Sequence, residues 1–166
     1  MRRWLAIALF TFTAQTALAQ SAAIAQSAAP DAGADATITL ERGACERRCP
    51  VYSVTVRSDG SAVYDGKHYV AKTGTEKTRV DTKAVRALVQ EFESLDFFAL
   101  RDVYGGEPGD CTERKPDSPR ATLTLKLDGR SKSVRLSVGC VGPVTSRLAA
   151  LGQAIDRLAE TERWTK

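Results

Sequence analysis

Hydrophobic and polar residues alternate along several stretches of the chain, as expected for β-strands that bury one face. Residues 36–43 (ATITLERG) form one such stretch, and residues 121–138 alternate on both sides of an Asp-Gly pair. A two-residue turn at that pair places Leu123 opposite Val134. Both apolar rows then lie on one face, which predicts a hairpin.

Residues 51–66 (VYSVTVRSDGSAVYDG) predict an earlier hairpin, again with an Asp-Gly turn. The sequence leaves two registers open for this hairpin. A two-residue turn places Val56 opposite Val63, whereas a three-residue turn places Val56 opposite Tyr64. Residues 67–80 predict one or two further strands.

Two other stretches repeat apolar residues every three or four positions, the spacing of an amphipathic helix. Asp81 is suited to cap the first helix, and Pro143 suits the first turn of the second. The two apolar stripes consist of Val85, Leu88, Val89, Phe92 and Leu95, and of Leu148, Leu151, Ile155 and Leu158. We expect Trp164 to pack back onto the core.

The order of these elements is strands, helix, hairpin and helix. Because the helices follow runs of strands and do not alternate with single strands, the order favours an α+β fold. We expect an antiparallel sheet built from hairpins, with two amphipathic helices packed on one face. Residues 37–164 are predicted to form this single domain, a usual size for one hydrophobic core.

The N-terminus has the features of a secretory signal peptide. A basic start is followed by an apolar run that is short of the roughly 20 residues needed to span a bilayer. Small residues then predict cleavage after Ala19, with Ala25 as the alternative. Residues 1–19 are therefore the predicted signal peptide, and residues 20–36, rich in Ala, Gln and Ser, the predicted flexible linker. A periplasmic or secreted protein is expected.

The charge of the chain gives no electrostatic case for nucleic acid or an anionic membrane as partner. The chain has 24 Lys and Arg against 20 Asp and Glu, and loss of Arg2 and Arg3 leaves 22 against 20. The two signs are interspersed, as on an ordinary solvated surface. No other segment is long and apolar enough to be predicted as a transmembrane helix.

All four cysteines follow the predicted cleavage site: Cys45, Cys49, Cys111 and Cys140. An even number in an exported chain favours disulfide bonds over free thiols. Four cysteines allow three pairings, and the sequence does not select one. We favour Cys45–Cys49, which requires residues 45–49 to form a turn, and Cys111–Cys140, which ties down the long segment 102–120.

The run CERRCPVYSVTVRSDGSAVYDG, followed by a helix ending FFAL, a hairpin and a last helix ending TERW, resembles a bacterial family. That family is domain of unknown function 6438, and its most specific element here is Cys-x-x-x-Cys-Pro-x-Tyr before the Asp-Gly hairpin. The resemblance runs from Ile38 to Trp164 and implies a small exported domain of unknown activity.

The Cys45–Cys49 pair also permits two kinds of chemistry. Cys-x-x-x-Cys-Pro is locally similar to exported copper chaperones of thioredoxin-like fold, and soft thiolates suit Cu(I). A thiol–disulfide catalyst is the other reading, although such enzymes place the attacking cysteine at a helix N-terminus and here Pro50 and a strand follow. A structural disulfide is the reading that we favour, so no cofactor and no metal site are predicted.

Catalytic constellations are hard to build from this sequence. The chain has one histidine, His68, which a Ser-His-Asp or Cys-His arrangement would have to use. The acidic segment 102–120 offers oxygen ligands for Ca²⁺ but lacks the spacing of a known ligand loop. Its carboxylates are Glu107, Asp110, Glu113 and Asp117.

We therefore expect a non-catalytic, disulfide-stabilised binding or structural module of the cell envelope. The expected partner is an envelope protein, a peptide or a cell-wall component. The candidate recognition surface consists of Arg47, Arg48, Tyr52 and Tyr104. The alternatives are a thiol–disulfide or copper-handling protein, and an inhibitor of a secreted enzyme that presents a loop such as 102–120.

Overall fold

A computed structural model describes residues 35–166, so the predicted signal peptide and most of the predicted linker lie outside the described residues. The strands are β1 (Ala36–Arg42), β2 (Val51–Arg57), β3 (Ser61–His68), β4 (Gly74–Arg79), β5 (Val103–Tyr104), β6 (Glu113–Arg114), β7 (Arg120–Leu127), β8 (Arg130–Ser137) and β9 (Cys140–Val141). The helices are α1 (Thr82–Ser94), the 3₁₀ turn η1 (Phe97–Ala99), α2 (Pro143–Ala159) and α3 (Glu162–Thr165). Ala36, assigned above to the linker, is the buried first residue of β1.

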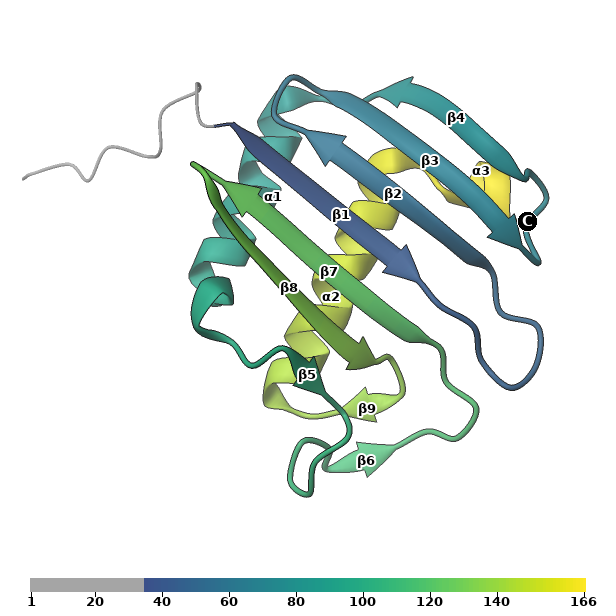
Figure 1. The fold of residues 1–166 in the computed structure, drawn as a ribbon, viewed down its shortest axis with the longest axis vertical. Coiled ribbons are helices and arrows are strands. Elements are labelled where there is room, and N and C mark those ends of the chain that lie inside the picture. Colours follow the sequence, from purple (N-terminus) through teal and green to yellow (C-terminus); the bar gives the residue numbers. More distant parts are fainter. Residues whose placement is uncertain (1–34) are drawn as a thin grey trace, which may run out of the picture.

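The predicted α+β fold is confirmed. Seven strands form one sheet in the order β4-β3-β2-β1-β7-β8-β5, and α1 and α2 lie against one of its faces (Figure 1). Neighbouring strands are antiparallel except for β5, which pairs in parallel with β8. Strands β6 and β9 form a separate two-stranded ladder. The sheet is therefore mixed, in contrast to the purely antiparallel sheet expected from the sequence.

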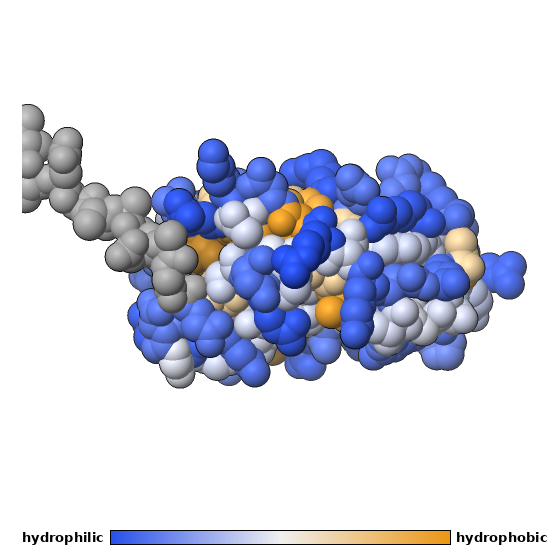
Figure 2. Space-filling model, turned by 90° about the horizontal axis from the view of Figure 1, so that it is seen from above, coloured by the Kyte–Doolittle hydropathy of each residue, from blue (hydrophilic) through white to orange (hydrophobic). Residues whose placement is uncertain are grey.

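Strand alternation places the core between the sheet and the helices. On β1 and β7 the apolar residues Ile38, Leu40, Leu123 and Leu125 have no exposed surface, and they meet the buried stripes of α1 and α2. The opposite face of the sheet carries hydroxyl side chains. Thr39 Oγ1 on β1 lies 3.2 Å from Thr55 Oγ1 on the neighbouring strand β2. The molecular surface seen in Figure 2 is mostly hydrophilic.

The register of the first hairpin differs from both predicted alternatives. Val56 pairs with Ala62, and Val54 with Tyr64. The turn contains three residues, because Gly60 adopts a positive φ of 79° and donates a hydrogen bond to the Arg57 carbonyl. This register keeps buried residues opposite one another on the core face, which pairing with Val63 would not. In the second hairpin, Leu123 pairs with Val134 as predicted.

Both helices begin where the sequence indicates. The Asp81 carboxylate accepts hydrogen bonds from the Lys83 and Ala84 amides at the start of α1. Pro143 occupies the first turn of α2. Near the C-terminus, the Trp164 ring stacks on Tyr64 with a centroid distance of 4.8 Å, so the last residues close over β3 as expected.

The segment 102–120 is more ordered than its composition suggests. It contains β5 and β6, which pair with β8 and β9 respectively. Two backbone hydrogen bonds extend the second ladder, from Thr112 to Val141 and from Lys115 to Gly139. Among the described residues, no helix has the length and apolar character needed to cross a membrane.

Candidate binding site at the disulfide-bonded end of the sheet

Residues 43–50, here called the clasp, connect β1 to β2 and are closed by the Cys45–Cys49 disulfide. The two Cα atoms lie 5.7 Å apart, so the segment forms the turn that this pairing requires. Pro50 precedes the first residue of β2. The clasp therefore fixes where the first hairpin starts.

The clasp is attached to a distant segment through Asp117. One oxygen of this carboxylate accepts the Glu46 amide at 2.7 Å and the Arg47 amide at 3.3 Å. The other oxygen accepts Arg47 Nε at 2.6 Å. The hydrogen bond from Arg47, supported by the amide donors, lowers the pKa of Asp117, and the same contact raises the pKa of Arg47. A single carboxylate thus orients the turn between Cys45 and Cys49.

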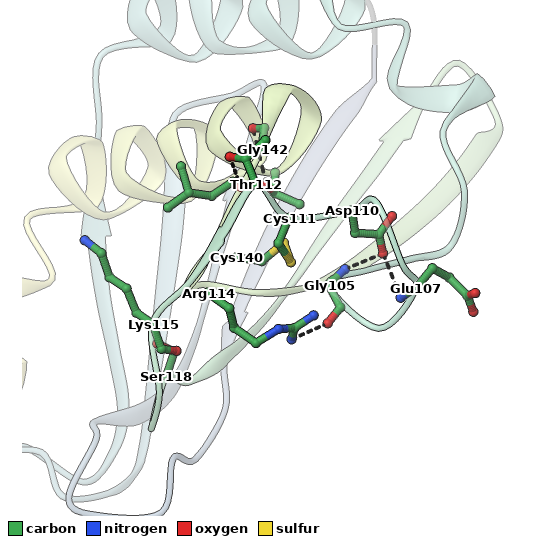
Figure 3. The surroundings of a disulfide bond; sticks show 12 residues. Gly105, Glu107, Asp110, Cys111, Thr112, Arg114, Lys115, Ser118, Cys140 and Gly142 are labelled. Carbon is green, nitrogen blue, oxygen red and sulfur yellow. Dashed lines mark hydrogen bonds between the residues drawn. A yellow bond between two sulfur atoms is a disulfide. The ribbon is translucent and has the colours of Figure 1, made fainter.

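Residues 105–119, here called the tied loop, are held by the second disulfide, Cys111–Cys140 (Figure 3). The two cysteine pairs in the structure are the ones favoured from the sequence. Within the tied loop, Ser118 Oγ donates to the Lys115 carbonyl at 3.0 Å. Both disulfides lie at the end of the sheet where β1 and β8 finish and where β2 and β7 begin (Figure 1).

Asp110 organises the other half of the tied loop. Its side chain, 4% exposed, forms an ion pair with Arg101. It also accepts hydrogen bonds from the Gly105 and Glu107 amides at 2.7 and 3.1 Å (Figure 3). The hydrogen bond from Arg101, and then those from the amides, lower the pKa of Asp110. Asp110 and Asp117 are therefore each engaged by an arginine. These two carboxylates, which the sequence offered as calcium ligands, accept hydrogen bonds from backbone amides and hold the backbone in place.

Two members of the candidate recognition surface are buried, which corrects the prediction for them. Tyr52 is 7% exposed, since its position on β2 faces α2. Tyr104 is 9% exposed, and Arg101 packs on its ring at 4.5 Å from the centroid. The other two members, Arg47 and Arg48, are exposed. Arg48 lies over the exposed ring of Tyr69 at 5.4 Å from the centroid.

Tyr52 belongs to a polar cluster that the sequence did not reveal. Its hydroxyl donates to Asp156 at 2.8 Å, and Arg42 donates to the same carboxylate at 2.6 Å. Thr161 Oγ1 adds a third hydrogen bond, of 3.1 Å. Burial and the neighbouring Asp156 charge raise the pKa of Tyr52 to about 12. The cluster joins β1 and β2 to α2, and its role is structural.

Two hollows open at the disulfide-bonded end. One, of about 460 Å³, lies between the clasp and the tied loop and is lined by Glu46, Arg114, Asp117 and Arg120 among others. The second, of about 380 Å³, lies against β5 and β8 and is lined by Gly106, Arg120, Arg135 and Ser137 among others. Arg120 and Ser137 line both hollows. We call these two neighbouring hollows together the groove.

Four cationic residues, Arg114, Lys115, Arg120 and Arg135, line the groove beside apolar surface, and the sequence carried no signal for this grouping. Alternation along β7 and β8 places Arg120 and Arg135 on the uncovered face, but only the folded sheet brings them beside the tied loop. Among the described residues, the exposed large hydrophobic side chains are Tyr69 and Val103. Val103 lines the second hollow and Tyr69 lies under Arg48 of the clasp, so this end offers a partner both cationic and apolar contacts.

Thiol exchange or copper binding would use Cys45 and Cys49, with His68 as the one histidine of the chain. His68 pairs with Val51, which is two residues after Cys49 in the chain. Both cysteines are in a disulfide, however, and within residues 35–166 no three His, Cys, Asp or Glu side chains gather as a metal site.

The comparisons with known proteins agree with this description of the fold. The family model for a domain of unknown function, DUF6438, matches residues 36–159, which include every strand of the sheet and both long helices. No curated protein matches the chain. The chain therefore belongs to the DUF6438 family.

Proposed function

We propose that this protein is an exported binding module of the bacterial cell envelope, with no catalytic role. In this proposal residues 1–19 are a signal peptide cleaved near Ala19, residues 20–36 are a tether, and residues 37–164 form the binding domain. The N-terminal sequence pattern and the two disulfides support it. The partner is an envelope protein, a peptide or a cell-wall component.

The observation that carries the proposal is the attachment of the clasp to the tied loop by Asp117. The clasp is closed by Cys45–Cys49, and the tied loop is anchored to β9 by Cys111–Cys140. The added ion pair joins them into one preorganised surface, which reduces the entropy lost when a partner binds. Exposed loops held on a rigid scaffold are a common location for binding residues.

A photo-crosslinking experiment in the native envelope tests this location. A photoreactive residue replaces Arg48 in the clasp in one variant and Lys126, on the same sheet but away from the clasp, in the other. We expect a discrete crosslinked species from position 48 and none from position 126. The same species from both positions, or none from either, would contradict the proposed surface.

Export is tested separately by the mass of the mature protein. A periplasmic or culture-medium form beginning at Gln20 supports the assigned cleavage, whereas Gln26 indicates the alternative site. An intact N-terminus in the mature protein contradicts export by this route.

The alternative function is thiol exchange or copper handling through Cys45 and Cys49, and the pairing of His68 with Val51, two residues after Cys49, is the observation that favours it. It predicts that the reduced protein binds Cu(I) stoichiometrically and that Cys45→Ser and His68→Ala each weaken this binding. Two disulfides that remain intact in periplasmic extracts, with no copper bound after reduction, exclude it.

Inhibition of a secreted enzyme is the remaining alternative, and the exposed tip of the tied loop at residues 107–109 is the feature that favours it. It predicts a tight complex with a hydrolase that is lost when Glu107 and Pro108 are replaced by alanine, with Gly109 kept because its φ is 89°. Because Cys111 and Asp110 are retained, such a variant keeps the anchors of the loop.

A further inference from the structure

The groove contains arginines whose charge is not neutralised by a neighbouring carboxylate. Among residues 35–166, ion pairs engage Arg42, Arg47 and Arg101, but none engages Arg114, Arg120 or Arg135. Two carboxylates line the groove, and one of them, Asp117, is occupied by Arg47. The groove therefore has an excess of positive charge.

Arg120 and Arg135 are placed together by the sheet. Arg120 lies opposite Ser137 and Arg135 opposite Thr122, so the two arginines are diagonal neighbours on one face of β7 and β8. Such positions are about 7–8 Å apart, within reach of two long side chains. Like charges at this spacing repel each other. Glu41, opposite Thr122 on β1, forms no ion pair with either arginine in the described residues.

Arg114 approaches from the tied loop. Its guanidinium donates a hydrogen bond of 2.7 Å to the Gly105 carbonyl, which holds the side chain across the loop (Figure 3). Lys115 also lines the groove, but its side chain points away from that of Arg114 (Figure 3). The second disulfide fixes the segment that carries Arg114, so this cation is held by the fold.

Guanidinium groups match oxyanions because their planar N–H donors form paired hydrogen bonds with two oxygens. Resting on the proposed function, we infer that the groove binds an oxyanion, a phosphate or carboxylate group of the envelope ligand, between Arg120 and Arg135. Arg114 contributes from the tied loop, and the Ser137 hydroxyl supplies a neutral donor. Each hollow is of a size that accommodates a small ligand group.

Calorimetric titration of the oxidised mature domain with inorganic pyrophosphate and with citrate tests the inference, and the two probes distinguish phosphate from carboxylate. We expect saturable binding of at least one probe, weakened about tenfold or more in Arg120→Gln/Arg135→Gln, which corresponds to about 1.4 kcal/mol. Lys126→Gln/Lys77→Gln is the charge-matched control, since it also removes two cations, and both lie on the uncovered face of the sheet outside the groove. It should bind like the wild type.

Binding that weakens equally in the control variant indicates diffuse electrostatic attraction and overturns the inference, as does the absence of binding by both probes. If the double variant does not fold, the Nε–H signals of the wild-type arginines give the answer. Shifts at Arg120 and Arg135 on titration support the site, and unchanged signals overturn it. A crosslinked partner at position 48 without oxyanion binding leaves the proposed function standing and removes only the ligand class.

Discussion

Tyr52 and Asp156, 104 residues apart in the chain, are joined by a hydrogen bond of 2.8 Å between the phenol and the carboxylate. The bond links β2 to α2 through the core. Asp156 also accepts a hydrogen bond from Arg42, so Arg42 of β1 and Tyr52 of β2 share one acceptor on α2.

Replacement of Tyr52 by Phe should lower the free energy of unfolding by about 1.5 kcal/mol, since a buried bond to a charged acceptor is lost. Tyr64→Phe is the control. The Tyr64 hydroxyl lies 3.4 Å from the Lys72 carbonyl, a weak contact, so its loss should be smaller. Denaturant unfolding at neutral pH measures both, and equal losses would argue against a special role for the Asp156 cluster.

The raised pKa of Tyr52 makes stability fall at high pH. The unfolded chain releases this phenolic proton near pH 10, whereas the folded protein keeps it until about 12. Between these values the unfolded state binds fewer protons, so stability decreases as the pH rises through this window. Unfolding curves from pH 9 to 12 should show a steeper decline for the wild type than for Tyr52→Phe. Parallel declines would contradict the assignment.

The Asp117 contact should give the opposite dependence at low pH. Because its folded pKa lies below the ordinary value of 3.8, the contribution is fully present above that value and is lost as the pH falls through the depressed pKa. The stability difference between wild type and Asp117→Asn should thus be constant near neutrality and shrink in acid. Arg47→Gln should also reduce this stability difference, since the hydrogen bond from Arg47 is the main cause of the lowered Asp117 pKa. A difference that persists unchanged in strong acid refutes this account.

The two disulfides should contribute unequally. Loop-entropy arguments assign about 2 kcal/mol to the five-residue closure of the clasp and about 3.5 kcal/mol to the longer closure by Cys111–Cys140. Chemical denaturation of Cys45→Ala/Cys49→Ala and of Cys111→Ala/Cys140→Ala compares them. The opposite ranking would mean that contacts made by the clasp, such as the Asp117 bonds, outweigh chain entropy.

Gly139 should not tolerate a side chain. A Cβ atom there would lie 2.0 Å from Ser118 Oγ and 2.7 Å from the Lys115 carbonyl oxygen. Gly139→Ala should therefore cost about 2 kcal/mol by overpacking and displace the turn next to Asp117. Gly106→Ala is the control, because nothing lies within 4 Å of the added atom. Thermal unfolding of the two variants checks the contrast.

Much of this fold could be predicted, because the signals for the helices and the second hairpin lie between residues that are close in the sequence. The Asp81 cap, the proline at the start of α2 and the two helical stripes depend on residues within a few turns of one another. The second hairpin was also predictable, since a two-residue Asp-Gly turn and two apolar rows agree on one register.

The errors arose where distant segments meet. Tyr52 was assigned to the recognition surface, yet it alternates in phase with Val54 and Val56 on β2, and that face is covered by α2. Tyr104 lies in a loop by composition but joins the sheet through parallel pairing with β8. The role of Asp117 likewise depends on contacts with a segment far away in the chain.

The place of β1 in the middle of the sheet has a consequence for how the chain folds. Its neighbours are β2, which follows directly, and β7, which pairs Thr37 with Lys126. A chain that emerges N-terminus first can complete one half of the sheet early, while the other edge of β1 waits for β7. Long-range pairing of this kind slows folding. Formation of the β1–β7 ladder should therefore be the late, rate-determining step of folding.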